Sequence, residues 1–67
     1  MPDQPNPRLG VRLKQLREEC GLTQEDLALK ADITVSTLSR IERDASSPRW
    51  NTVTKIADAL GISVRDI

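Results

Sequence analysis

The stretch TQEDLALKADITVSTLSRIER, residues 23–43, decides the fold because it holds two short helical patterns in immediate succession. Thr23 is a suitable N-terminal cap for the first pattern, and Thr34 is a suitable cap for the second. Apolar residues on either side of each cap have the spacing of hydrophobic staples: Leu22 with Leu27, and Ile33 with Leu38. Only Asp32 and Ile33 remain between the two patterns, so the sequence predicts two helices joined by a tight turn.

The second of these helices has one apolar side and one side with no residue needed for a core. Leu38 and Ile41 form an i, i+3 apolar seam. The residues outside the seam are short or cationic: Val35 in the first turn, then Ser36, Ser39, Arg40 and Arg43. Such a face can enter a DNA groove, and the alternative interpretation is an ordinary solvated helix face.

Further helices are predicted on both sides of this pair. An i, i+4, i+7 apolar stripe predicts a first helix that ends near Cys20, with Gly21 as its stop: Leu9, Leu13 and Leu16. Asn6 and Pro7 resemble a cap and a first helical residue, which would start that helix there. The second helix runs from about Gln24 to Ala31 and should bury three residues: Leu27, Ala28 and Ala31.

A fourth helix is predicted near the C-terminus from a longer apolar stripe: Trp50, Val53, Ile56, Ala57 and Leu60. Because Trp50 is the only aromatic residue, we interpret it as a lid on the core rather than as a base-stacking platform. Gly61 stops this helix. The staple and cap pattern then recurs at Ile62, Ser63 and Ile67, so a fifth helix should begin there. Because the sequence ends within it, we expect a fragment of a longer protein, and the alternative is a full chain that ends unusually early.

The composition predicts one small all-α domain without a covalent or metal staple. A chain of 67 residues buries only about 60% of the surface that its unfolded form exposes. One cysteine cannot form an internal disulfide, and the absence of histidine removes the usual zinc ligands and the usual acid–base group. We therefore expect no cofactor, no metal site and no enzymatic activity. Neither a membrane span nor a signal peptide is recognisable, so a cytoplasmic location is expected.

The zero net charge is unfavourable for a nucleic-acid binder, but the distribution of the charges along the chain is not. Ten basic residues balance ten acidic residues, and the pI is about 6.2. Between residues 34 and 55, however, the basic residues outnumber the acidic pair Glu42 and Asp44: Arg40, Arg43, Arg49 and Lys55. Acidic residues concentrate elsewhere: Glu18, Glu19, Glu25, Asp26, Asp58 and Asp66. The part of the chain around the second helix of the pair is therefore locally basic.

Residues 1–7 carry three prolines and no basic residue, so a flexible tail is expected, with a DNA-contacting arm as the less favoured alternative. The domain proper is predicted to span residues 8–67.

LTQEDLALKADITVSTLSRIER resembles the helix-turn-helix of the Cro/repressor-type regulators, the Xre family. LGVRLKQLREECG resembles the first helix of that family, and SPRWNTVTKIADALGIS resembles its fourth helix with the closing turn. The resemblance implies a compact four- to five-helix bundle of the lambda-repressor-like DNA-binding type. Asp32 and Asp44 depart from the family, which usually has glycine at these two positions.

The resemblance also implies a function and a set of site residues. A homodimer would place the helix around residues 34–43 in the major groove of an operator and act as a transcriptional regulator, with two half-sites about 34 Å apart. The expected base-contacting residues are Val35, Ser36, Ser39 and Arg40. The expected phosphate-contacting residues are Gln24, Arg43, Ser46, Ser47, Arg49 and Asn51. Members with an arginine at the position of Arg17 often pair it with the glutamate matching Glu42.

Several alternatives remain open at this stage. Gln24 can be an ordinary polar residue at a helix start, and Ser47 with Pro48 can be the cap and first residue of the fourth helix. Arg17 can be unpaired and exposed. Exposed Val11 and Leu29, with the zero net charge, fit a second function, an antitoxin-type module that binds a partner protein. A further effector or partner domain in the parent chain is also open.

Overall fold

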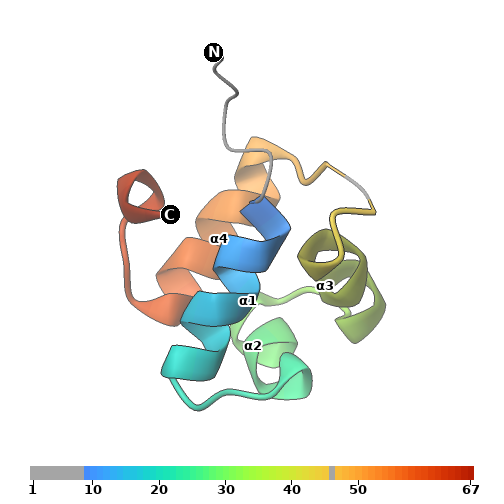
Figure 1. The fold of residues 1–67 in the computed structure, drawn as a ribbon, viewed down its shortest axis with the longest axis horizontal. Coiled ribbons are helices and arrows are strands. Elements are labelled where there is room, and N and C mark those ends of the chain that lie inside the picture. The colour runs from blue at the N-terminus through green and yellow to red at the C-terminus, as the bar shows by residue number, and fades with distance from the viewer. Residues whose placement is uncertain (1–8, 46) are drawn as a thin grey trace.

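The computed structural model describes residues 9–45 and 47–67, which form four α-helices and one short 3-10 helix. In chain order these are α1 (Leu9–Glu19), α2 (Gln24–Ala31), α3 (Val35–Glu42), α4 (Trp50–Leu60) and the 3-10 helix η1 (Val64–Asp66) (Figure 1). No strand occurs in these two ranges, which confirms the all-α prediction. The predicted tail at residues 1–7 and the predicted helix start at Asn6 and Pro7 lie outside the described residues.

The two helix starts in the deciding stretch are capped as the sequence predicts. The Thr23 hydroxyl accepts a hydrogen bond from the Asp26 backbone N–H at 3.0 Å, and the Asp26 carboxylate accepts one from the Thr23 backbone N–H at 3.1 Å. This reciprocal capping box holds the first turn of α2. The Thr34 hydroxyl likewise accepts a hydrogen bond from the Thr37 backbone N–H at 3.1 Å.

Ser47 was expected either to contact phosphate or to cap the fourth helix, and the start of α4 disagrees with the second of these predictions. The helix begins at Trp50 with Arg49 as its cap residue, and Arg49 makes no side-chain capping bond. The interpretation of Ser47 and Pro48 as cap and first helical residue is therefore wrong. The fixed φ of proline suits extended backbone as well as a helix start, and Arg49 after it is still extended, with φ −73° and ψ 155°.

All four α-helices end in the same way. A residue with a positive φ follows each helix end, directly at Asp32 and Gly61 and after one intervening residue at Gly21 and Asp44. Two backbone bonds then close each end, as at α2, where Asp32 N–H donates to Leu29 O and Ile33 N–H to Ala28 O. This is the Schellman arrangement, in which glycine is the usual residue. Aspartate tolerates the left-handed conformation, so Asp32 and Asp44 keep the turns at which the resemblance led us to expect glycine.

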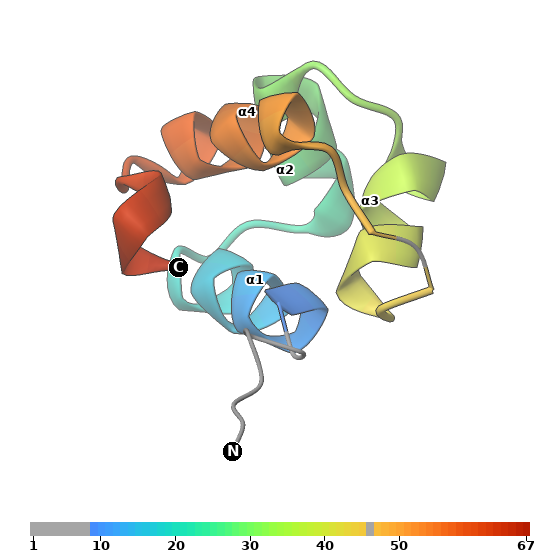
Figure 2. The same ribbon diagram turned by 90° about the horizontal axis from the view of Figure 1, so that it is seen from above.

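The core lies between two pairs of helices. α2 packs on α4 and α1 on α3, and α2 joins the pairs through its contact with α3. Figure 2 shows α1 on the opposite side of the molecule from α4. The buried apolar residues come from all four helices: Leu13, Leu27, Ala28, Ala31, Leu38, Ile41, Val53, Ile56, Ala57 and Leu60. The predicted apolar faces of the helices are thus confirmed, with one exception.

Trp50 is the exception, because its side chain is 71% exposed. The prediction of a core lid is wrong. Trp50 is the first residue of α4, and the buried face of the helix begins one turn later, at Val53. The spacing of the stripe was correct, but the sequence does not show that its first position lies outside the packed core of the described residues.

Where the start of a fifth helix was predicted, the chain makes a short 3-10 helix. Ser63 caps it as predicted, and its hydroxyl accepts a hydrogen bond from the Arg65 backbone N–H at 3.2 Å. Ile62 and Ile67 on either side of the turn pack against the core. No helix in the described part of the chain is long and apolar enough to cross a membrane.

Candidate nucleic-acid interface

α3 separates a buried side from an exposed side. Leu38, Ile41 and Glu42 are buried. The predicted base-contacting residues are more accessible: Val35, Ser36 and Arg40 are exposed, and Ser39 is half-buried. The side of α3 that carries these four residues is therefore available to a ligand, and base contact itself stays a prediction.

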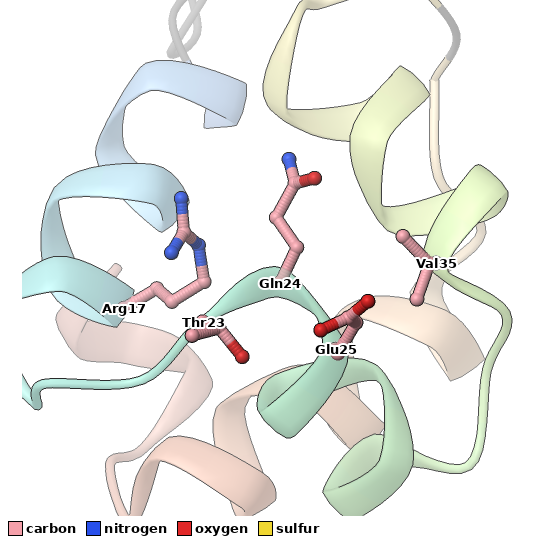
Figure 3. A pocket seen from close by; sticks show the side chains of 5 residues that line it. All are labelled: Arg17, Thr23, Gln24, Glu25 and Val35. Atoms are coloured by element: carbon pink, nitrogen blue, oxygen red, sulfur yellow. The ribbon is translucent and has the colours of Figure 1, made fainter.

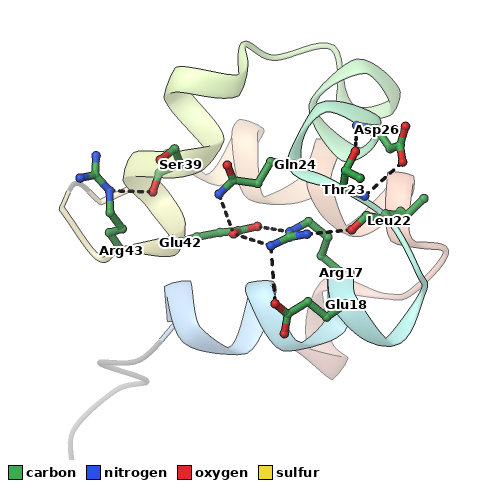
Figure 4. A network of polar contacts seen from close by, with 9 residues as sticks. All are labelled: Arg17, Glu18, Leu22, Thr23, Gln24, Asp26, Ser39, Glu42 and Arg43. Atoms are coloured by element: carbon green, nitrogen blue, oxygen red, sulfur yellow. Dashed lines mark hydrogen bonds and ion pairs between the residues drawn. The ribbon is translucent and has the colours of Figure 1, made fainter.

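Arg17 and Glu42 hold the buried side of α3 to α1, as the resemblance implied. The guanidinium Nε donates to Glu42 Oε2 at 2.8 Å, and Nη2 donates to Oε1 at 3.2 Å (Figure 4). Nη1 donates to the Leu22 carbonyl at 2.7 Å. Both residues are buried, at 8% and 5% exposure, so the alternative of an exposed, unpaired arginine is wrong. The hydrogen bond to Glu42 raises the pKa of Arg17, against the opposing effect of burial.

Gln24 joins this pair from the start of α2. Its Nε2 donates to Glu42 Oε1 at 3.0 Å, and its side chain is half-buried. A carboxamide nitrogen carries two hydrogens, so the bond to Glu42 leaves one of them for another acceptor. The predicted phosphate contact is therefore chemically compatible with the observed position.

A hollow of about 430 Å³ lies beside Gln24, between the start of α2 and the start of α3. Its lining residues come from three segments: Arg17, Thr23, Gln24, Glu25 and Val35. Figure 3 shows the Gln24 side chain extending between Arg17 on one side and Val35 on the other. The hollow thus joins the predicted phosphate-contacting residue of α2 to the first predicted base-contacting residue of α3.

The remaining predicted phosphate-contacting residues follow α3. Arg43, Ser47, Arg49 and Asn51 are exposed, and Ser46 lies outside the described residues. Arg43 Nε donates to the Ser39 carbonyl at 3.3 Å, which keeps the guanidinium beside the last turn of α3. These residues are placed on the surface as the prediction requires, and their contact with phosphate stays a prediction.

The surface formed by residues 34–55 carries a larger excess of positive charge than a count of its charged residues indicates. Arg40, Arg43, Arg49 and Lys55 are all exposed. Glu42, one of the two acidic residues in the same segment, is buried against Arg17. Among the described residues of this segment, Asp44 is therefore the one exposed carboxylate beside four exposed cations.

One contact that affects this surface was missed in the sequence. Asp44 Oδ1 accepts a hydrogen bond from the backbone N–H of Gly10 at 3.0 Å, across 34 positions of sequence. The unusual aspartate at a glycine position was noticed, but no local pattern indicates its distant partner. No pattern in the sequence assigns a role to Gly10.

The described residues contain no group of three or more acidic, cysteine or histidine side chains that could hold a metal ion. Cys20, which directly follows α1, is an exposed free thiol.

Comparison with known proteins agrees with this geometry. A family described as helix-turn-helix matches residues 13–67. The immunity repressor protein of Bacillus phage phi105 is 46% identical over 59 residues, which cover 88% of this chain and 41% of that protein. The HTH-type transcriptional regulator DdrOP3 of Deinococcus deserti is 40% identical over 60 residues, covering 90% of this chain and 46% of that protein. The chain thus spans less than half the length of these two relatives.

Solved structures with the same fold cover almost the whole chain. The restriction-modification controller protein C.AhdI from Aeromonas hydrophila is 34% identical with a TM-score of 0.87, over 88% of this chain and 89% of that one. The clp gene regulator ClgR from C. glutamicum is 31% identical with a TM-score of 0.84, over 94% and 84% of the two chains. These proteins are named as regulators and not as enzymes. The chain therefore belongs to the helix-turn-helix family of Cro/repressor (Xre) type, as its sequence motifs indicated.

Proposed function

We propose that this chain is the DNA-binding part of a transcriptional regulator, most simply a repressor, and that it places α3 in the major groove of an operator. The observation that carries the proposal is the exposed side of α3. It presents Val35, Ser36 and Arg40 to solvent, while the C-terminal end of the helix is fixed to α1 by the buried pair of Arg17 and Glu42. A rigid helix with a short, cationic outer face is what major-groove reading requires.

Each proposed contact has a chemical role. Arg40 can donate two hydrogen bonds to guanine O6 and N7, which would supply about 1–3 kcal/mol of discrimination. Val35 can pack against a thymine methyl group, and the serine hydroxyls can donate or accept. Gln24, Arg43, Ser47, Arg49 and Asn51 would hold phosphates on the two sides of the groove and so fix the register of α3.

One domain of this size makes few base contacts, so we propose that the regulator acts as a homodimer on two half-sites about 34 Å apart. The relatives are named as regulators and repressors and are longer than this chain, which supports a parent protein with a further domain for assembly or effector binding. Its site of action would be nucleoid DNA in the cytoplasm.

The test is a fluorescence-anisotropy titration of a mixed-sequence duplex with the wild-type chain and two double variants. Arg40→Ala with Arg43→Ala removes two cations from α3. Lys14→Ala with Arg65→Ala removes two exposed cations from α1 and η1 and serves as the charge-matched control. Each phosphate contact contributes about −0.9 to the slope of log affinity against log salt concentration. The slope of the Arg40→Ala, Arg43→Ala variant should therefore be shallower than that of the wild type by up to about 1.8, and the slope of the control variant should change much less.

Equal losses in the two double variants would show that net charge alone drives binding, and would contradict a role for α3. An antitoxin-type module that binds a partner protein is the second candidate, because Leu29 is 83% exposed on α2. Binding of a partner through an apolar surface would be nearly independent of salt, whereas phosphate binding would not.

A further inference from the structure

Asp44 has a backbone role and a separate side-chain role at the end of α3. Its φ is 56°, and the turn is closed by hydrogen bonds from Asp44 N–H to Ile41 O at 3.0 Å and from Ala45 N–H to Arg40 O at 2.9 Å. Its carboxylate leaves this turn and accepts a hydrogen bond from Gly10 N–H at 3.0 Å. The end of α3 is thereby bonded to the first turn of α1 as the structure describes it.

Gly10 makes this contact possible because it has no side chain. A Cβ atom built on Gly10 would lie 2.1 Å from the Ile41 backbone oxygen, 2.8 Å from Asp44 Oδ1 and 3.0 Å from the Glu42 backbone carbon. The first two separations are shorter than any real carbon contact. α1 and the end of α3 therefore touch backbone to backbone, and an amide near the start of a helix lacks an intrahelical acceptor and favours a negatively charged one.

Asp32 shows that the side-chain bond is not a consequence of the turn itself. It closes α2 with the same arrangement and a φ of 60°, yet its side chain makes no hydrogen bond to the described residues. The contact between Asp44 and Gly10 is thus an additional feature of the turn after α3.

The bond between Asp44 and Gly10 lies next to a residue of the proposed DNA interface, Arg43. Glu42 and Asp44 flank Arg43, and each is bonded to α1, through Arg17 and Gly10 respectively. Arg43 thus lies between two fixed residues while its own side chain is exposed. Ser47 and Arg49, the next proposed phosphate contacts, follow within five residues of Asp44.

We propose that Asp44 is a positioning residue of the DNA interface, and that its bond to Gly10 sets the direction in which Arg43 and Arg49 approach the phosphates. This inference rests on the function proposed above. The carboxylate would act through the loop and not by contact with DNA, where its charge is unfavourable. The hydrogen bond from Gly10 thus gives the Asp44 carboxylate, the only exposed one in the described part of residues 34–55, a partner within the protein.

The test compares two variants of the 67-residue chain that change the charge equally. Asp44→Asn keeps an oxygen acceptor and tolerates a positive φ, whereas Asp44→Gly keeps the turn but has no acceptor for Gly10. Both variants remove one negative charge, so any general gain in attraction to DNA is the same. Amide hydrogen exchange at Gly10, measured by NMR without DNA, should become faster in Asp44→Gly and stay near wild type in Asp44→Asn.

The DNA measurement uses a mixed-sequence duplex between about 50 and 200 mM salt. We expect Asp44→Asn to bind at least as tightly as wild type. Asp44→Gly should bind about tenfold more weakly than Asp44→Asn at the lower salt, with a slope reduced by about 0.9, because one phosphate contact is lost. A role in stability alone would change the unfolding midpoint and leave this slope unchanged.

Equal affinity and equal slope for the two variants would overturn the positioning role while leaving the proposed function intact. Absence of salt-sensitive binding by the wild-type chain would overturn both. The two failures are therefore distinguished by the wild-type titration.

Discussion

Arg17 and Glu42 form a buried two-point ion pair across 25 positions of sequence, with Nε–Oε2 and Nη2–Oε1 distances of 2.8 and 3.2 Å. The pair is also the meeting point of three segments, because Glu42 accepts from Gln24 and Arg17 donates to the Leu22 carbonyl. It therefore connects α1, the start of α2 and the end of α3. Its energetic importance follows from burial, since removal of either partner leaves the other charge at a position that is at most 8% exposed to solvent.

Glu42→Ala should destabilise the domain by about 3–5 kcal/mol, because it leaves the Arg17 guanidinium buried without its carboxylate. A single core of this size supplies only about 3–5 kcal/mol of net stability, so the variant should be largely unfolded at room temperature. The measurement is urea unfolding followed by circular dichroism. Loss of less than 1 kcal/mol would show that the pair is solvated in solution.

The double variant Arg17→Met with Glu42→Leu is the control for that experiment. Replacing both charges with apolar residues avoids the unpaired buried charge, so much of the stability should return. Recovery should be incomplete, because the Leu22 carbonyl and the Gln24 amide lose their partners.

The sequence predicts those parts of this fold that depend on neighbouring residues. The caps at Thr23 and Thr34 and the stop at Gly61 each depend on contacts within one helical turn. Such contacts are encoded in short patterns, and all three were predicted correctly. The pair of Arg17 and Glu42 was predicted only through family resemblance, because no local rule connects residues so far apart.

The features that could not be predicted from the sequence depend on tertiary packing. The bond from Gly10 to Asp44 requires the backbones of α1 and α3 to touch, and this distance is set by the whole core. The exposure of Trp50 depends on which element, if any, lies opposite the first residue of α4. The exposed face of α3 could be predicted, but the bases that it contacts are a property of a complex.

The capping box of α2 predicts a pH dependence. Hydrogen bonds from the backbone N–H and then the hydroxyl of Thr23 lower the pKa of Asp26 below its ordinary value, with a smaller effect of Lys30. The unfolded chain therefore binds this proton more readily, so the stabilisation is present above about pH 4 and is lost as the pH falls through the folded pKa. Asp26→Asn should be less stable than wild type at pH 7, and the difference should shrink towards pH 3.

Thr23→Ala, at the other residue of the capping box, serves as the comparison for Asp26→Asn. It removes the hydroxyl but keeps the backbone N–H that bonds Asp26, so we expect a loss of about 1 kcal/mol that varies less with pH. Thermal unfolding of both variants between pH 3 and pH 7 separates the two contributions. A constant difference between Asp26→Asn and wild type over this range would contradict the assignment.

Asp32→Gly should stabilise the domain by up to about 1 kcal/mol. The left-handed conformation is costly for a residue with a Cβ atom and free for glycine, although glycine also gains entropy in the unfolded chain. Asp44→Gly should gain less or lose stability, because it also gives up the bond to Gly10. Urea unfolding of the two variants side by side provides the measurement. A larger gain at position 44 would show that the bond contributes nothing.

Trp50 provides the last prediction, because it is the only aromatic residue and lies between Arg49 and Asn51 on the proposed phosphate-contacting surface. Its exposure predicts that Trp50→Ala costs less than about 1 kcal/mol, whereas Leu38→Ala, at a fully buried position, should cost about 2–5 kcal/mol. For the same reason the fluorescence maximum of the folded chain should lie close to that of the unfolded chain. If DNA covers this end of α4, duplex binding should alter the emission, and the change should disappear at high salt. A blue-shifted maximum in the free chain, or a large stability loss in Trp50→Ala, would instead place the indole in a packed environment.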